Sequence, residues 1–140
     1  MAKFLTLTDK CNLRCSFCYE IPIDGSPHTF EAEPETFEPE LYKAMHDEGW
    51  KEVVITGGEP TMMPTFFRAI AESHRQGYEK IIVASNGRRF AYPDFARRAR
   101  LAGLTHANIS LFGHTRIIHD GTTKQRGSFE QTNEGIRNLL

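Results

Sequence analysis

The stretch W-K-E-V-V-I-T-G-G, residues 50–58, follows Gly49 and shows the pattern that organises the chain. A glycine is followed by a bulky residue and a short apolar run, and the run ends in small polar residues. The pattern recurs as Y-E-K-I-I-V-A-S-N-G after Gly77 and as L-T-H-A-N-I-S-L-F-G after Gly103. These glycines are 28 and 26 residues apart, which is the length of one strand–helix unit. The repeat therefore predicts strands that alternate with helices.

Glycine and proline place helices between these runs. Glycine accepts the left-handed backbone that closes a helix, so each of the three glycines marks the end of a predicted helix. Proline suits the first helical position, which favours starts at Pro64 and Pro93. S-F-E-Q, with Ser128 followed three residues later by Gln131, matches a capping box. The predicted helices cover residues 38–48, 64–76 and 93–102, and a last one starts at Ser128.

A predicted strand over residues 4–8 completes the order of strand and helix, repeated four times. This order predicts an α/β fold with a parallel sheet and right-handed crossovers. The runs V-V-I and I-I-V are continuously apolar, as expected for strands that are covered on both faces. The segment 21–35 contains three prolines and a glycine, and we interpret it as a loop.

Chemically distinctive residues follow each predicted strand. Ligands bind at the carboxyl ends of the strands in parallel α/β folds, so a site is expected where these residues meet. The residues are Cys11, Cys15 and Cys18 after the first strand, Gly57, Gly58, Glu59 and Pro60 after the second, Ser85, Asn86 and Gly87 after the third, and Ser110 after the fourth.

The composition indicates one soluble globular unit. The chain has 140 residues, 39% of them apolar and 25% charged, with a net charge of −1, so no overall field attracts nucleic acid or a membrane. No apolar run reaches the roughly 18 residues of a membrane span, and no signal-peptide pattern is present, so we expect a cytoplasmic protein with reduced thiols. Two runs of like charge are expected to be solvated: Glu31, Glu33, Glu35, Glu38 and Glu40, and Arg88, Arg89, Arg97, Arg98 and Arg100.

All three cysteines lie in C-N-L-R-C-S-F-C, residues 11–18, with the spacing C-x3-C-x2-C. Structural zinc requires four ligands, and the six histidines show no paired ligand pattern that would supply the fourth. A ferredoxin-type electron carrier needs four thiolates per cluster. Three close thiolates suit a four-iron cluster with one iron open to a small ligand. Zinc binding and incidental cysteines remain alternatives at this point.

The octapeptide resembles the C-x3-C-x-aromatic-C signature of the radical S-adenosylmethionine (SAM) superfamily, with Phe17 in the aromatic position. G-G-E-P, residues 57–60, resembles the second motif of that family and lies at the same place, the end of the second strand. The stretch I-S-L-F-G at residues 109–113, the pair His119-Asp120 and the helix start at residues 127–129 are similar to the family's fourth-strand region. The resemblance covers essentially the whole chain.

The resemblance implies that Cys11, Cys15 and Cys18 ligate three irons of a [4Fe-4S] cluster and that the fourth iron chelates S-adenosyl-L-methionine. One electron, from an external donor of the flavodoxin or ferredoxin type, then breaks the S–C5′ bond. This gives methionine and a 5′-deoxyadenosyl radical that abstracts hydrogen from an organic or peptide substrate. Family members with similar G-G-E-P and I-S-L-x-G motifs modify peptides or build cofactors.

The resemblance also implies roles for the other strand-end residues. Gly57 and Gly58 would let the backbone approach SAM, with carbonyls that accept from its ammonium group. Glu59 would add negative charge there, Pro60 would stiffen the turn, and Phe17 would pack against the adenine. Ser85, Asn86 and Ser110 are suited to the ribose or the methionine carboxylate, although S-N-G is also an ordinary turn. His114, His119 and Asp120 are expected to contact substrate or to cap a loop.

The family fold is a partial (β/α)6 TIM-like barrel, and this sequence supplies the N-terminal four strand–helix units of one. Residues 1–140 are therefore expected to be an incomplete radical SAM core domain, with strand four exposed at an edge. A non-catalytic iron–sulfur or zinc-binding module is the alternative function. Nucleic-acid base modification lacks the basic, aromatic-rich surface that it requires.

Overall fold

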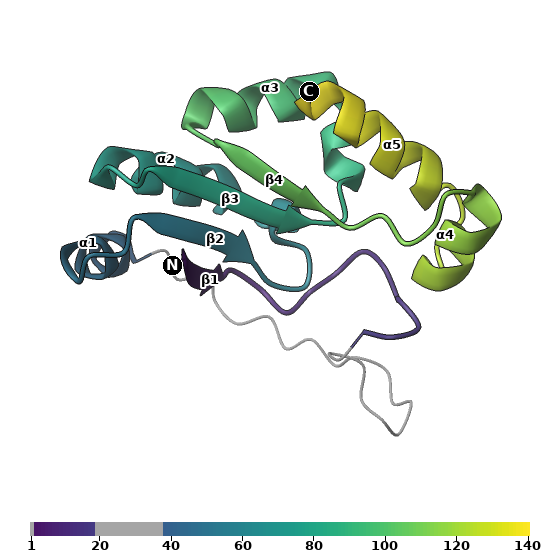
Figure 1. Cartoon of the computed structure of the whole chain (residues 1–140), viewed down its shortest axis with the longest axis horizontal. Helices are drawn as coiled ribbons and strands as arrows, with labels where there is room; N and C mark the ends of the chain where they lie inside the picture. The colour runs from purple at the N-terminus through teal and green to yellow at the C-terminus, as the bar shows by residue number, and fades with distance from the viewer. Residues whose placement is uncertain (1, 19–37) are drawn as a thin grey trace.

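The computed structural model describes residues 2–18 and 38–140, so the predicted loop over 21–35 lies outside the described residues. The four strands are β1 (Ala2–Thr6), β2 (Glu52–Thr56), β3 (Lys80–Ser85) and β4 (His106–Ile109). They form one parallel sheet in the order β1-β2-β3-β4, with β4 at an edge (Figure 1). The predicted α/β fold and parallel sheet are confirmed, and the arrangement is that of part of a TIM-like barrel.

Helices follow the strands in the predicted alternation. The α-helices are α1 (Pro39–Asp47), α2 (Phe66–Gln76), α3 (Pro93–Ala102), α4 (Arg116–Thr123) and α5 (Ser128–Leu139), and two 3-10 turns are η1 (Pro60–Met62) and η2 (Arg88–Ala91). Figure 1 shows α1, α2, α3 and α5 along the sheet, with α4 beyond the carboxyl ends of the strands. Gly77 and Gly103 cap α2 and α3 at positive φ, as predicted.

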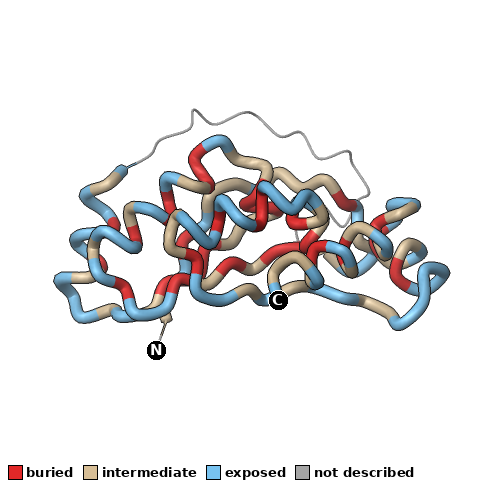
Figure 2. Tube along the Cα trace, turned by 90° about the horizontal axis from the view of Figure 1, so that it is seen from above, coloured by how far each residue is buried: buried red, intermediate tan, exposed pale blue. Residues whose placement is uncertain are grey.

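One core lies between the sheet and the helices that cover it. Strand residues Leu5, Val53, Ile55, Ile81 and Val83 belong to it, and buried residues run along the strands and the inner helix faces in Figure 2. Alternate strand residues point to the other face. There, Phe4 is exposed and Ile82 is half-buried, so the expectation of two covered faces is only partly met within the described residues.

Two predicted boundaries and one predicted cap are wrong for local physical reasons, whereas the last helix begins at Ser128 as predicted. The first strand ends at Thr6 rather than residue 8, because the ladder stops where Gly57 takes a φ of 141°. The helix predicted from Pro64 begins at Phe66, because P-T-M forms the turn η1 first and Thr65 becomes the N-cap. Ser128 does not cap its helix, since Gly127 is the N-cap and no side-chain cap bond forms.

Helix α4 was not predicted. Its sequence, R-I-I-H-D-G-T-T, is rich in β-branched residues and contains Gly121, which lower helix propensity. The Thr115 hydroxyl caps its first turn by accepting from the Ile118 N–H. Tertiary contacts therefore stabilise a segment that the local sequence disfavours.

Candidate functional site

The G-G-E-P turn after β2 is hydrogen-bonded to the segment that leads from β1 to the first cysteine. The Gly58 N–H donates to the Thr8 carbonyl and the Glu59 N–H donates to the Lys10 carbonyl, both at 2.7 Å. A Cβ at Gly57 would lie 2.2 Å from the Thr8 oxygen, and one at Gly58 would lie 2.4 Å from the Lys10 oxygen. Both positions therefore require glycine, because the loops that follow β1 and β2 are in backbone contact here.

Glu59 is fully buried (0% exposed) and connects the ends of β2 and β3. One carboxylate oxygen accepts from the Thr61 N–H and hydroxyl and from the Ser85 hydroxyl, at 3.2, 2.5 and 2.8 Å. The other oxygen accepts from the Asn86 N–H at 2.8 Å. Such a set of donors satisfies a buried carboxylate. The structure thus gives Glu59 a positioning role, and its contact with a ligand stays a prediction. Glu59, Thr61, Ser85 and Asn86 are called the strand-end network below.

Ser85 and Asn86 are buried and continue this network towards the cysteines. The Ser85 oxygen also accepts from the Gly87 N–H at 3.0 Å, so S-N-G does form a hydrogen-bonded turn. The Asn86 amide donates to the Asn12 side-chain oxygen at 2.8 Å, and the Asn86 carbonyl accepts from Thr132 in α5. Contact of either residue with ribose or a carboxylate remains a prediction.

The cysteine loop, residues 11–18, runs across the carboxyl ends of the strands. All three cysteines are half-buried. The loop closes through the Cys18 N–H and the Cys15 carbonyl at 3.0 Å. It is bound to the end of α4, where the Arg14 and Ser16 N–H groups donate to two threonine carbonyls at 3.0 and 2.9 Å. The backbone of the loop is therefore bound to the end of α4, and the segment that leads into it is bound to the G-G-E-P turn.

Burial and neighbouring charges change the pKa of two of the thiols. Burial raises the pKa of Cys11, as do the charges of Glu59 and Cys18, while hydrogen bonds from the Leu13 backbone and the Asn86 side chain act to lower it. Burial and the charges of Cys11 and Cys18 raise the pKa of Cys15 to about 11. Each thiolate opposes the next one, so the ionised triad needs a positively charged group to bind.

Phe17 and Ser110 lie at the exposed rim of the same edge. Phe17 is 60% exposed and packs edge-on against Phe112, with ring centroids 4.8 Å apart. Ser110 is exposed, and its N–H donates to the Ser85 carbonyl at 3.0 Å. Pro60 is buried and opens η1, which agrees with its expected role in the turn. Packing of Phe17 on an adenine and a ribose contact of Ser110 are not tested by these contacts.

A sequence model described as the Radical SAM superfamily matches residues 5–140. The chain belongs to the radical SAM superfamily. Its relatives include a protein named "Probable GTP 3',8-cyclase" from Saccharolobus solfataricus, 31% identical over 138 residues that make up 97% of this chain and 42% of that protein. The "GTP 3',8-cyclase" of Peptoclostridium acidaminophilum is 32% identical over 136 residues, 95% of this chain and 40% of that protein.

"Molybdenum cofactor biosynthesis protein 1" of Mus musculus is 32% identical over 139 residues, which cover 97% of this chain and 21% of that protein. The chain therefore spans about two-fifths or less of the length of these relatives. Members of the radical SAM superfamily use a [4Fe-4S] cluster and SAM, so the residues of this chain can be compared with what that cluster requires.

The donor set of the cysteine loop, three thiols, is of the kind that binds an iron–sulfur cluster. In residues 2–18 and 38–140, no three His, Cys, Asp or Glu side chains lie close enough together to hold a single ion. A zinc ion requires its ligands to converge on one point at about 2.3 Å from each sulfur. In an iron–sulfur cluster each thiolate binds a different iron, so the sulfurs surround the cluster instead. The loop supplies three thiols for such a cluster, and their binding of one stays a prediction.

Asp120 caps the start of α5, whereas its neighbour His119 bonds the segment that follows β4. The Asp120 carboxylate accepts from the Gly127 and Phe129 N–H groups and the Ser128 hydroxyl, at 2.7, 2.8 and 2.9 Å. Partial burial would raise the pKa of Asp120, but these hydrogen bonds together lower it. The expected loop-capping role is therefore confirmed for Asp120. His119 is 1% exposed, and its Nδ1 accepts from the Phe112 N–H at 3.1 Å.

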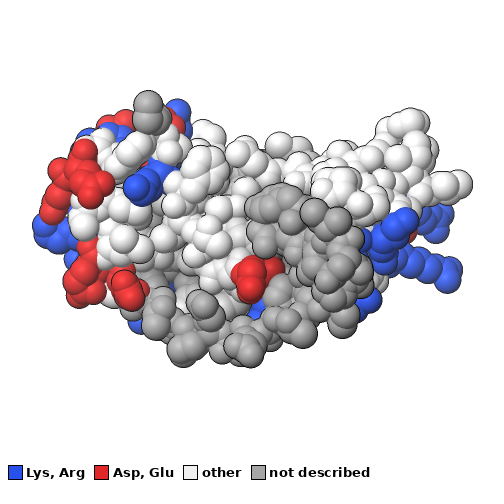
Figure 3. All heavy atoms as spheres, turned by 90° about the horizontal axis from the view of Figure 1, so that it is seen from below, with Lys and Arg blue, Asp and Glu red and all other residues white. Residues whose placement is uncertain are grey.

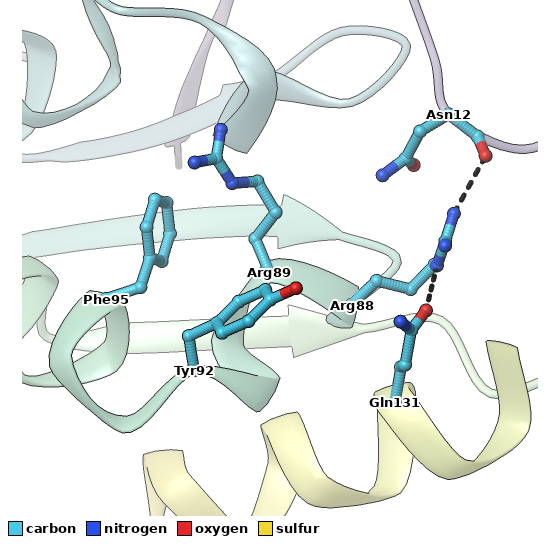
Figure 4. Close-up of a pocket in the computed structure, with 6 residues that line it drawn as sticks. All are labelled: Asn12, Arg88, Arg89, Tyr92, Phe95 and Gln131. Atoms are coloured by element: carbon cyan, nitrogen blue, oxygen red, sulfur yellow. Dashed lines mark hydrogen bonds between the residues drawn. The ribbon is translucent and has the colours of Figure 1, made fainter. Parts of the chain in front are cut away.

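Sequence reasoning missed a second set of residues beside the cysteine loop. A pocket of about 490 Å³ is lined by Asn12, Arg88, Arg89, Tyr92, Phe95 and Gln131 (Figure 4). Arg88 was expected to lie on a solvated face, which is wrong: it is half-buried and donates to Asn12 and Gln131. Its place directly after S-N-G was the available signal, whereas nothing local marked Gln131.

The charged surface is uneven. On the face seen from below in Figure 3, Lys and Arg side chains gather at the α4 end, and acidic side chains gather at the α1 end. Exposed basic residues at the α4 end include Arg116, Lys124 and Arg126. Among the described residues, no helix is both long and apolar enough to span a membrane.

Proposed function

We propose that this chain carries the cofactor-binding part of an enzyme that cleaves SAM reductively at a [4Fe-4S] cluster. One observation carries the proposal: two 2.7 Å backbone hydrogen bonds join the G-G-E-P turn to Thr8 and Lys10, the segment that leads directly into the cysteine loop. The segment that precedes Cys11 thus lies against a turn whose first residue, Gly57, is 39 positions after Cys18. In parallel α/β folds the carboxyl edge of the sheet is where ligands bind.

In this proposal Cys11, Cys15 and Cys18 hold the cluster, and Gly57, Gly58 and Pro60 border the SAM. When bound, the cluster and SAM supply the reductive cleavage that yields a radical able to remove hydrogen from an organic substrate. The chain's own residues act by orientation. The strand-end network fixes the turn and the S-N-G segment relative to each other, and the loop contacts to α4 fix the cysteines. Phe17 and Ser110, exposed at the rim, are then positioned to contact the nucleoside part of SAM.

The relatives favour one substrate class over another. Their printed names, GTP 3',8-cyclase and molybdenum cofactor biosynthesis protein, point to the synthesis of a cofactor from a small molecule. We therefore favour a small organic substrate over a peptide. The electron is proposed to come from an external donor protein of the flavodoxin or ferredoxin type. We also propose that the four units belong to a longer, six-unit core domain, because the chain covers 42% of its Saccharolobus solfataricus relative.

The test is anaerobic reconstitution with iron and sulfide, followed by SAM and a strong reductant, with detection of 5′-deoxyadenosine. The wild-type protein is expected to form it, and Cys11→Ala, Cys15→Ala and Cys18→Ala are each expected to lose the cluster or the product. Ser16→Ala, an exposed change in the same loop, is the matched control and should retain both. A folded, cluster-loaded protein that forms no 5′-deoxyadenosine would support a non-catalytic iron–sulfur module. Preferential binding of zinc would support a zinc module.

A further inference from the structure

Arg88 connects the cysteine loop to the helix layer. Its Nε donates to the Gln131 side-chain oxygen in α5 at 2.6 Å, and one terminal nitrogen donates to the Asn12 carbonyl at 2.9 Å. Figure 4 shows the guanidinium between these two residues, which come from the cysteine loop and α5. Because the guanidinium is planar with donors in a fixed fork, two simultaneous hydrogen bonds hold both partners in one geometry.

The backbone of Arg88 also takes part in hydrogen bonds that lead to Asn12, the residue after Cys11. The backbone N–H of Arg88 donates to the Asn86 side-chain oxygen at 3.1 Å. The Asn86 side chain in turn donates to the Asn12 side chain at 2.8 Å, and it acts to lower the pKa of the Cys11 thiol. The Arg88 side chain therefore contacts the backbone carbonyl of the residue after Cys11, and the Arg88 backbone contacts the Asn86 side chain that bonds Asn12.

Arg88 also brings a positive charge to this place. Six ion pairs occur in the described part of the chain, and Arg88 is in none of them. The side chain is half-buried, so water screens its charge less than it screens an exposed one. Net charge, hydrogen bonding and solvent exposure around a cluster set its reduction potential. A cluster gains one negative charge on reduction, so a neighbouring cation favours the reduced form.

We propose that Arg88 is a positioning residue that fixes the cysteine loop and raises the reduction potential of the cluster bound there. This inference rests on the proposed function, because it requires a cluster on Cys11, Cys15 and Cys18. It assigns a role to a residue outside both sequence motifs. For a one-electron couple, a tenfold change in the ratio of reduced to oxidised cluster corresponds to a 59 mV shift in potential. A modest electrostatic effect on the midpoint potential is therefore measurable.

The test compares midpoint potentials of the reconstituted protein by EPR-monitored redox titration. Arg88→Gln removes the charge, and Gln131→Glu keeps the arginine but neutralises it with a carboxylate at the same hydrogen bond. Both are expected to lower the midpoint potential, whereas Arg88→Lys keeps the charge and should stay near the wild type. Arg89→Gln is the matched control, because Arg89 donates to the Thr61 carbonyl, lies over the Phe95 ring and points away from Asn12.

Hydrogen exchange of the protein without its cluster tests the positioning part separately. Arg88→Gln should speed exchange of the amides of residues 12–18, and Arg89→Gln should not. If Arg88→Gln does not fold, Gln131→Glu and Arg88→Lys carry the comparison of potentials. Equal potentials in loaded wild type, Arg88→Gln and Gln131→Glu overturn the inference and leave the proposed function intact. Equal shifts in Arg88→Gln and Arg89→Gln also overturn it. A wild-type protein that takes up no cluster defeats both.

Discussion

The two sides of this molecule are stabilised by different kinds of interaction. The helix side is an apolar core in which Phe66, Ile70 and Val83 are fully buried. The strand-end edge is polar, and it is ordered by hydrogen bonds to one buried carboxylate and by glycines in backbone contact. Apolar packing is non-directional, whereas a hydrogen bond depends on both the distance and the angle between donor and acceptor. Stability is therefore expected to depend on the helix side, and the geometry of the site on the strand-end edge.

The largest expected effect on stability comes from the aromatic core. Phe66 is 0% exposed and stacks on Phe95 with ring centroids 5.7 Å apart. Phe66→Ala should lower the free energy of unfolding by about 3–5 kcal/mol, because it removes buried apolar surface and leaves a cavity. Denaturant unfolding measures this change. Leu101→Ala, at an exposed position of α3, is the control, and an equal loss there would contradict this view of the core.

Gly57→Ala should instead damage the site. The residue has a φ of 141°, and a Cβ would lie 2.2 Å from the Thr8 oxygen. Backbone strain of about 1–3 kcal/mol is expected, together with displacement of the cysteine loop from the G-G-E-P turn. Iron content after reconstitution measures the displacement. Gly121→Ala, where no atom lies within 4 Å, is the matched control and should retain iron at the wild-type level.

Glu59→Gln tests the strand-end network with almost no change in shape. One oxygen is replaced by an NH2 group that faces other donors, so the cost should be about 1–3 kcal/mol for the unsatisfied groups. The loss should also loosen the S-N-G segment and reduce cluster retention. Glu79→Gln, an exposed carboxylate, supplies the comparison. Wild-type stability and iron content in Glu59→Gln would show that the network is not what orders this edge.

The smallest expected effect is a pH dependence. Burial lowers the pKa of His119, so the folded protein binds fewer protons there than the unfolded chain does. Stability should therefore fall as the pH drops below the ordinary histidine value of about 6.5, by at most about 1.4 kcal/mol per pH unit. Unfolding measured from pH 7.5 to pH 5 should show this slope, and His119→Asn should reduce it. The exposed His114→Asn variant should keep the slope.

Local sequence predicted the parts of the fold that depend on local chemistry. Helix α3 has the predicted bounds, because Pro93 begins it and Gly103 ends it. The strand-end residues were found because each follows an apolar run. The S-F-E-Q capping box was wrong because Asp120, eight residues earlier, accepts from Ser128 and caps α5 instead. The residues next to Ser128 in the sequence do not indicate that Asp120 takes the capping role.

The hydrogen bonds of the Arg88 side chain also could not be predicted from the local sequence. Its hydrogen-bond partners lie 76 and 43 residues away in the chain, in Asn12 and Gln131. A basic run is usually solvated, and for Arg97, Arg98 and Arg100 this interpretation is confirmed by their exposure. Arg88 differs because η2 turns it towards the cysteine loop. Tertiary structure, rather than residue type, decides which arginine of the run acts at the site.

The central claim is that the cysteine loop and the G-G-E-P turn form one site where SAM meets a [4Fe-4S] cluster. The most direct measurement is the EPR spectrum of the reconstituted, reduced wild-type protein with and without SAM. We expect a cluster signal that changes when SAM is added, because SAM would bind the iron that no cysteine ligates. A cluster signal that is identical with and without SAM would contradict the claim.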